Sequence, residues 1–193
     1  VLTSSYLNQL TGAEIFFKCE NLQKVGAFKE SCASNAVFGM SEADDANGVA
    51  THSSGNHAGA LSFAAALRGI DATVVMPHNA PATKKAAVRS YGGNIIECEP
   101  TQAAREATLE KEVTQSGANV VHPYDDSRVI AGQATCVLEL HQDIGDLDAV
   151  VAPIGGGGLI SGTCLALSTL SPQTKIYAAE PAQADDAYRS FQA

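Results

Sequence analysis

The chain has 193 residues, enough for one sizeable domain or two small ones with a buried core. Apolar residues make up 45% of it and charged residues 17%, which is typical of a globular protein and excludes an intrinsically disordered one. The net charge of -9 argues against a nucleic-acid or anionic-membrane partner, because binding to phosphate groups needs clustered Lys and Arg.

Short β-rich runs and helical patterns alternate along the chain. We expect strands at residues 14–20, 48–53, 72–77, 94–99, 118–123, 148–154 and 175–181. We expect helices at residues 28–40, 56–69, 82–91, 101–116, 128–142 and 159–170, and the last residues, "AYRSFQA", read as part of another. This alternation predicts βαβ units and parallel sheets in an open α/β fold. In such folds ligands bind beyond the carboxyl ends of the strands.

The five cysteines are odd in number and widely scattered, and no two have C-x-x-C spacing. They read as reduced thiols of a cytoplasmic protein. No apolar run has membrane-spanning length, and no signal segment opens the chain. The chain begins without methionine and stops within a helical pattern, so we expect it to be a piece of a larger protein.

The stretch "APIGGGGLISG" (152–162) is the strongest local signal. Four consecutive glycines between a buried strand and a helix bring backbone N–H groups together at the positive end of the helix, which favours a phosphate. The dinucleotide pattern G-x-G-x-x-G fails because its third glycine falls on Ile160 or Ser161, and the Gly-Lys pair of a P-loop is absent. A flexible linker is the alternative, but a linker is not held between a strand and a helix.

The stretch "THSSGNHAGA" (51–60) also lies between an expected strand and an expected helix. Ser53, Ser54, Asn56 and His57 place hydroxyl, amide and imidazole groups around Gly55. Capping of the helix is the alternative, since Ser and Asn are preferred N-cap residues. One cap needs one residue, however, and here there are four, so we favour a binding loop.

The stretch "KVGAFKES" (24–31) places Lys29 among small and apolar residues. A lysine is usually solvated. A desolvated lysine has a lowered pKa and becomes a nucleophilic amine that forms a Schiff base with an aldehyde. A lysine, a phosphate loop and an amide-bearing loop together indicate pyridoxal phosphate, which needs all three.

The motifs "FFKCENLQKVGAFK", "SSGNHAGA", "HPYDDSRVIAGQ", "PIGGGGLISG" and "AAEPAQADDAYRS" follow one another in a chain that resembles a known family. This family is the serine racemase and serine/threonine dehydratase group of fold-type II pyridoxal-phosphate enzymes. The opening stretch "VLTSSYLNQLTG" and the segment "AEPAQADD" resemble most the branch of serine racemase and 3-hydroxyaspartate dehydratase. The resemblance implies a tryptophan synthase β-like α/β fold with two open parallel-type sheets flanked by helices. Residues 1–47 and 125–193 would belong to a large cofactor-binding domain, incomplete here, and residues 48–124 to a small mobile domain.

The resemblance also implies a role for each matching residue. Lys29 would bind the cofactor and move a proton on one of its faces, and Ser54 would be the acid or base on the opposite face. Phe28 would pack beside the cofactor ring, and Asn56 would bond its phenolic oxygen. Two groups of residues would bind anions. Gly155, Gly156, Gly157 and Gly158 would bind the cofactor phosphate, and Ser53, Ser54, Asn56 and His57 would bind the substrate.

In the same family a divalent-cation site would use Glu180, the backbone oxygen of Ala184, and Asp186. Oxygen ligands of this kind suit Mg²⁺ or Ca²⁺. The alternative is that Glu180 and Asp186 are ordinary carboxylates at a strand end and a helix start.

The implied activity is the dehydration of small hydroxy amino acids such as serine, threonine or 3-hydroxyaspartate, whose product hydrolyses to a 2-oxo acid and ammonia, or their racemisation, since both begin with removal of the α-proton. A catalytically impaired remnant that binds a phosphate ligand or a partner protein is the alternative. A nucleotide-dependent oxidoreductase is weakened by the failed dinucleotide pattern. The family is commonly dimeric, so a homodimer is expected.

The chain departs from the family at a few positions. Glu30, Ser31 and Cys32 follow the lysine where the family has an arginine-glycine pair. Gly59 replaces a glutamine near a nucleotide effector site of the racemase branch, and Ala134 replaces a glycine, so regulation by ATP is not expected.

Overall fold

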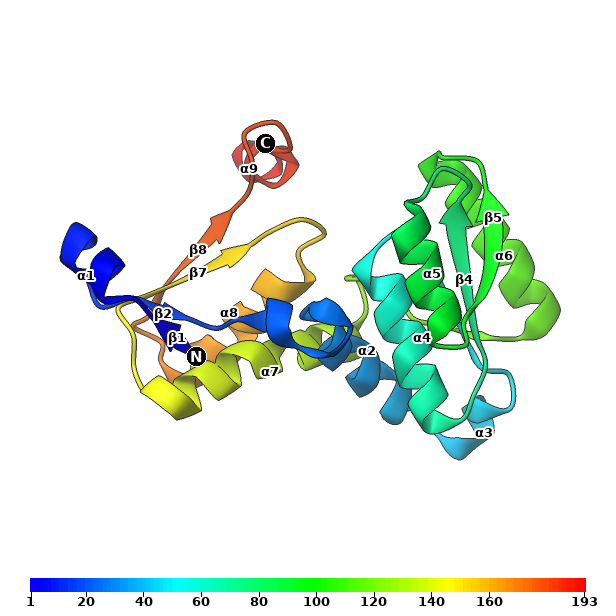
Figure 1. Ribbon diagram of the computed structural model, residues 1–193, viewed down its shortest axis with the longest axis horizontal. Coiled ribbons are helices and arrows are strands. Elements are labelled where there is room, and N and C mark those ends of the chain that lie inside the picture. Colours follow the sequence, from blue (N-terminus) through cyan, green and yellow to red (C-terminus); the bar gives the residue numbers. More distant parts are fainter.

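Parallel strands form two of the three sheets in the computed structural model, which describes all 193 residues (Figure 1). The largest sheet has the order β5-β4-β3-β6 and consists of β3 (Val49–His52), β4 (Ala72–Pro77), β5 (Asn94–Cys98) and β6 (Asn119–Val120). The second is the parallel pair β7 (Ala149–Pro153) and β8 (Lys175–Ala179). The third is the antiparallel pair β1 (Leu2–Thr3) and β2 (Phe16–Phe17).

All the expected helices are present, and two short ones, Ser5–Thr11 and Glu42–Asp45, were not predicted. The helices are α1 (Ser5–Thr11), α2 (Lys29–Phe38), α3 (Glu42–Asp45), α4 (Asn56–Arg68), α5 (Ala82–Ser90), α6 (Gln102–Ser116), α7 (Ser127–Ile144), α8 (Gly158–Leu170) and α9 (Asp186–Gln192), with 3-10 helices at Glu20–Leu22 and Lys24–Gly26. The predicted α/β fold is confirmed. No helix is both long and apolar enough to cross a membrane.

The strand predicted at residues 14–20 is wrong in extent and in pairing. Only Phe16 and Phe17 are extended, and they pair antiparallel with β1 rather than joining a parallel sheet. The chain then enters the two 3-10 helices, in which Val25 and Gly26 have φ of 57° and 69°. The predicted strand is cut short because the first of these helices already begins at Glu20, with Cys19 as its N-cap residue. The strand predicted at residues 118–123 is likewise shortened to Asn119 and Val120.

The two central strands of the four-stranded sheet, β3 and β4, are buried on both faces, as is usual for parallel sheets. On one face Val74 and Met76 of β4 pack with Ala58 of α4 and Val88 of α5. On the other face Val75 packs with residues of β3 and α6. The side chains of β4 therefore alternate between two helical layers. The turn after β3 lies at the carboxyl end of the strands.

Figure 1 shows two lobes, one with the four-stranded sheet and α4 to α6, the other with β7, β8 and α8. Helix α2 lies between them. Its small residues Cys32, Ala33 and Ala36 are fully buried in the largest core cluster, together with residues of α4. Its other side packs on α7, where a Cβ at Gly132 would lie 2.6 Å from the Cα of Cys32. The sheet and α4 to α6 lie within residues 48–124, but the predicted division into two domains stays a prediction.

Candidate active site

Lys29 is the first residue of α2, and its amine turns toward a carbonyl of a distant segment. Its Nζ donates a hydrogen bond of 2.6 Å to the backbone oxygen of Pro123 and lies 5.1 Å from the centre of the Phe28 ring. Burial lowers the pKa of Lys29, and the neighbouring thiol of Cys32 opposes that shift. A lysine with a lowered pKa is more readily neutral and therefore nucleophilic.

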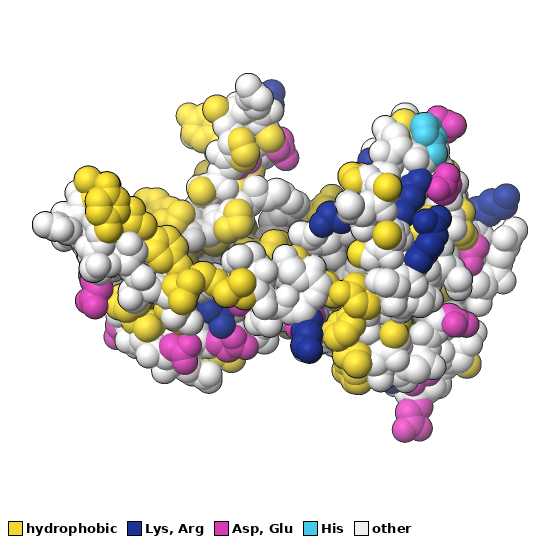
Figure 2. Space-filling view, in the orientation of Figure 1, with side chains coloured by type: hydrophobic (Ala, Val, Ile, Leu, Met, Phe, Trp, Pro, Cys, Tyr) yellow, Lys and Arg dark blue, Asp and Glu magenta, His cyan; other side chains and the backbone are white.

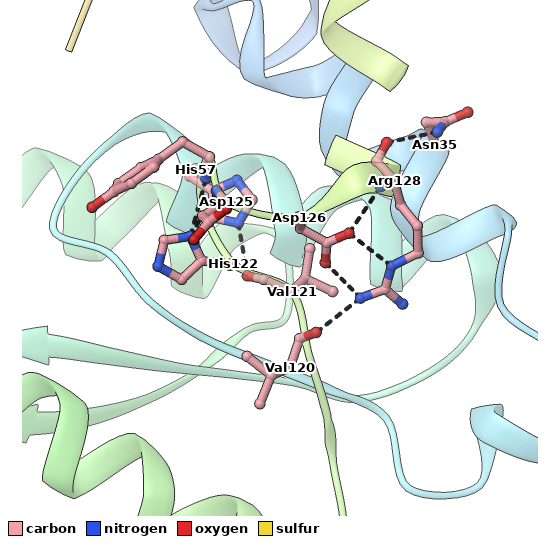
Figure 3. Close-up of polar contacts among 9 residues, drawn as sticks. Asn35, His57, Val120, Val121, His122, Asp125, Asp126 and Arg128 are labelled. Carbon is pink, nitrogen blue, oxygen red and sulfur yellow. Dashed lines mark hydrogen bonds and ion pairs between the residues drawn. The ribbon is translucent and has the colours of Figure 1, made fainter. Parts of the chain in front are cut away.

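Residues 121–126, which we call the bridging segment, run from β6 to α7 and carry that carbonyl. His122 Nδ1 accepts the backbone N–H of Asp125 at 2.8 Å, and His57 Nε2 lies 3.2 Å from the oxygen of Val121 (Figure 3). Asp126 caps α7 by accepting the backbone N–H of Arg128. The segment is therefore held at both ends and in its middle.

Arg128 ties the bridging segment to its surroundings. Its guanidinium donates to the carboxylate of Asp126 at 2.6 Å and to the oxygen of Val120 at 3.0 Å (Figure 3). Its own carbonyl accepts a hydrogen bond of 2.7 Å from Asn35 of α2. Three elements, β6, α7 and α2, are thus joined beside the segment that faces Lys29.

The glycine loop lies against Tyr124 of the same segment. A Cβ at Gly156 would come within 2.3 Å of the Tyr124 ring, and one at Gly158 within 3.2 Å of that residue. Gly157 has φ of 88°, and α8 begins immediately after it. Only glycine allows the backbone to pass so close to the ring, and the free N–H groups at the start of α8 suit a phosphate. Because Tyr124 follows Pro123, the glycine loop and the amine of Lys29 flank two adjacent residues.

The polar side chains of the turn after β3 are not used to cap the helix that follows. Gly55 is the N-cap of α4 and no side chain caps that helix, so the capping alternative is not what the structure has. Ser53 Oγ accepts the N–H of Gly55 at 3.3 Å, and Ser54 makes no side-chain hydrogen bond within the protein. Asn56, the first residue of α4, accepts a hydrogen bond from Lys84 on its Oδ1.

His57 differs from the other residues of this turn because its imidazole points into the interior. Only 2% of the residue is exposed, and its Nδ1 is buried without a partner. Burial, and then the charge of Lys29, lower the pKa of His57 to about 3, so the ring is neutral. The predicted contact of His57 with a substrate can therefore come only from its backbone N–H in the first turn of α4.

Glu180 and Asp186 lie apart from these residues. The Glu180 carboxylate accepts the backbone N–H groups of Tyr188 at 2.7 Å and Ala187 at 3.3 Å, and Asp186 is the first residue of α9. No group of three or more His, Cys, Asp or Glu side chains is placed to hold a metal ion. The structure has the helix-start arrangement that the sequence left open as the alternative.

Tyr124 and Lys84 contact predicted site residues, but the sequence did not single them out. Tyr124 had one signal available, since it follows the carboxyl end of a strand, where ligands of parallel sheets bind. Lys84 had none, because it lies in a helix 28 positions from Asn56.

A family model described as "Pyridoxal-phosphate dependent enzyme" matches residues 1–193. The β-hydroxyaspartate dehydratase of Paracoccus denitrificans (strain Pd 1222) is 64% identical over 193 residues, which are 100% of this chain and 61% of that protein. The serine racemase of Dictyostelium discoideum is 48% identical over 191 residues, which are 99% of this chain and 59% of that protein.

Solved structures agree with this picture. The crystal structure of the Dictyostelium serine racemase matches with a TM-score of 0.95 and 47% identity, over 100% of this chain and 62% of that one. The structure of maize serine racemase matches with a TM-score of 0.97 and 44% identity, over 98% of this chain and 58% of that one. A threonine deaminase also matches, with a TM-score of 0.91 and 40% identity over 99% of this chain and 62% of that one. The chain thus spans about 60% of the length of the relatives it matches.

Proposed function

The chain belongs to the family of pyridoxal-phosphate-dependent enzymes, and from that premise we propose that it converts small hydroxy amino acids to 2-oxo acids and ammonia, by loss of water and then hydrolysis of the product, or inverts their α-carbon. One observation carries the proposal. The half-buried amine of Lys29 and the glycine loop flank adjacent residues of the bridging segment, Pro123 and Tyr124. A nucleophilic amine beside a phosphate cradle suits a phosphorylated aldehyde.

The residues present fit pyridoxal phosphate. Lys29 would bind its aldehyde, and Gly155 to Gly158 would hold its phosphate with backbone N–H groups at the start of α8, a helix of 13 residues. Phe28 would pack beside the ring. Asn56 would donate to the phenolic oxygen, and its Nδ2 makes no other hydrogen bond within the protein. The bound cofactor would supply an electron sink for the pair left when the α-proton departs.

Lys29 is the proposed base. The carbonyl of Pro123 holds its free amine in place, and burial favours the neutral form that accepts a proton. The burial of His57 serves the same end, because a neutral imidazole adds no positive charge beside the amine.

Ser54 is the proposed acid or base of the opposite face. Its hydroxyl makes no hydrogen bond within the protein and is free to carry a proton. Departure of the β-hydroxyl after α-proton removal gives elimination, whereas proton delivery by Ser54 gives inversion. Both outcomes share the step at Lys29.

The substrate class rests on the relatives. Proteins named β-hydroxyaspartate dehydratase, serine racemase and threonine deaminase all match more than nine tenths of the chain. Small hydroxy amino acids, namely serine, threonine and 3-hydroxyaspartate, are therefore the proposed substrates. The substrate carboxylate would be bound by Ser53, Asn56 and the first backbone N–H groups of α4.

Three further parts of the proposal rest on the family alone: a homodimer, a cytoplasmic location, and a Mg²⁺ or Ca²⁺ site at Glu180, Ala184 and Asp186. The cation would have to share the carboxylate of Glu180 with two backbone N–H groups. Thermal unfolding of the protein and of Glu180→Gln, each with and without either cation, tests the site. Stabilisation of the unaltered protein alone supports it, and equal shifts in both contradict it.

The proposal is tested with the visible spectrum of the purified full-length protein after addition of pyridoxal phosphate. Borohydride reduction and peptide mapping then identify the modified lysine, and serine, threonine and 3-hydroxyaspartate are assayed for 2-oxo acid and for inversion. We expect the adduct on Lys29, its loss in Lys29→Ala, and its persistence in Lys24→Ala, an exposed lysine of the preceding turn. Adducts spread over surface lysines would contradict the proposal.

A further inference from the structure

Lys84 and Asn56 form a contact that the proposed mechanism does not use. Lys84 lies near the start of α5, and Asn56 is the first residue of α4, a helix that packs beside α5 (Figure 1). The Nζ of Lys84 donates to the Oδ1 of Asn56. Lys84 belongs neither to the glycine loop nor to the turn after β3. Its contact nevertheless reaches Asn56, a side chain proposed to hold the cofactor.

The chemistry of this pair determines which way the amide faces. An ammonium group has three donors and no acceptor, whereas an amide has a donor end and an acceptor end of similar shape. Lys84 can therefore bond only the oxygen of Asn56, and the Nδ2 is turned away from it. The Nδ2 donates no hydrogen bond within the protein and is free for an acceptor that approaches the turn.

We propose that Lys84 is a positioning residue that holds the Asn56 amide with its NH₂ group toward the phenolic oxygen of the cofactor. Without Lys84 the amide would be free to rotate, and its other orientation would present an oxygen to an oxygen. The inference rests on the proposed function, because it assumes that Asn56 binds the cofactor.

The adjacent lysine supplies a matched control. Lys85 donates to the carboxylate of Glu97 at 2.6 Å and to the carbonyl of His78 at 2.7 Å. Lys85 has the same charge as Lys84 and lies in the same helix, but it forms no hydrogen bond with Asn56. Met has nearly the same helix propensity as Lys, so Lys→Met changes at both positions preserve the helix.

The test measures the dissociation constant of pyridoxal phosphate by titrating the full-length apo-protein and following the visible absorbance. Lys84→Met is expected to weaken binding about tenfold, as for loss of a charged hydrogen bond. Lys84→Arg, which is also a donor without an acceptor, is expected to retain most of the affinity. Lys85→Met is expected to stay within about twofold of the unaltered protein.

A double-mutant cycle separates positioning from a general effect of charge. In an Asn56→Ala background, Lys84→Met is expected to cause no further loss, because the two residues act as a unit. An equal loss in both backgrounds would overturn the inference.

Failure of the inference and failure of the proposed function give different results. If Asn56→Ala weakens binding and Lys84→Met does not, the inference fails and the proposed function stands. If Asn56→Ala does not weaken binding either, Asn56 does not bind the cofactor, and the inference fails together with that proposed role. If borohydride traps no cofactor on Lys29, the proposed function itself fails.

Discussion

Burial lowers the pKa of both Lys29 and His57, two ionisable groups of the site. The charge of Lys29 is the second cause, after burial, of the lowered pKa of His57. Both groups are therefore held toward their neutral forms, and each makes the stability of the fold depend on pH.

His57 is expected to destabilise the fold in acid. The unfolded chain binds a proton at His57 below pH 6.5, whereas the folded protein does so only near a pKa of about 3. The unfolded state then holds more protons, so the free energy of unfolding decreases as the pH is lowered, by up to about 1.4 kcal/mol per pH unit. Urea unfolding between pH 7 and pH 4 should show a shallower fall in His57→Gln. His78→Gln, on an exposed histidine, serves as the control, and an unchanged slope in His57→Gln would contradict the prediction.

Lys29 is expected to cost the apo-protein stability at neutral pH. Its pKa in the fold is lowered, so between that pKa and the ordinary value of 10.5 the unfolded chain binds the proton better. Replacing Lys29 by Met should raise the free energy of unfolding of the apo-protein by about 1 kcal/mol at pH 7, as is common for functional residues. The gain should shrink as the pH approaches 10.5. Lys24→Met should show neither effect, and a loss of stability in Lys29→Met would show that the bond to Pro123 outweighs burial.

At the scale of elements, glycines decide how closely the segments of the site approach one another. Gly132 brings α7 against α2, and Gly162 brings α8 against α7, where an added Cβ would lie 2.6 Å from the backbone nitrogen of Ala134. Gly156 does the same for the glycine loop and Tyr124. The starts of α2, α7 and α8 thereby meet around the bridging segment.

Gly156→Ala is expected to separate the glycine loop from Tyr124. The new Cβ would lie 2.3 Å from the ring, which must shift, and we expect a loss of about 1–3 kcal/mol in the free energy of unfolding. A Cβ at Gly155 meets nothing within 4 Å, so Gly155→Ala should change stability by less than about 1 kcal/mol. Urea unfolding of both apo-proteins provides the comparison. Equal effects of the two changes would argue against a close contact with Tyr124.

At the scale of the whole molecule, the two lobes differ in how well their sheets are covered. Val74, Val75 and Met76 of β4 are fully buried. In the other lobe Val151 of β7 is 68% exposed and Tyr177 of β8 52%, and Phe191 of α9 is 94% exposed. Figure 2 shows hydrophobic side chains at the surface of this lobe. A sheet of two strands with open faces is only marginally stable in itself.

Hydrogen exchange of the 193-residue chain should reveal this difference. We expect the backbone amides of β8 to exchange about a hundredfold faster than those of β4, because local opening needs less free energy where few apolar contacts are lost. The antiparallel pair β1 and β2 should also exchange fast. Equal protection of β4 and β8 would show that the two-stranded sheet is stabilised as well as the four-stranded one.

Much of the fold followed from local patterns. β-rich runs such as residues 72–77 and the small-residue helix after residue 55 were predicted within a residue or two, because their side-chain periodicity follows directly from backbone geometry. The strand at residues 14–20 failed because the chain leaves the extended conformation after Phe17 and enters a 3-10 helix at Glu20, and no local pattern signals that change.

The sequence by itself determined the α/β class, the glycine loop before α8, and the lysine that the small residues of 24–31 set apart. Only the tertiary structure decided that Lys29 faces Pro123, 94 positions away, that His57 is neutral and interior, and that Lys84 contacts Asn56. The physical reason is that backbone preferences depend on neighbours along the chain. Burial, pKa and hydrogen-bond partners depend instead on which distant segments pack together.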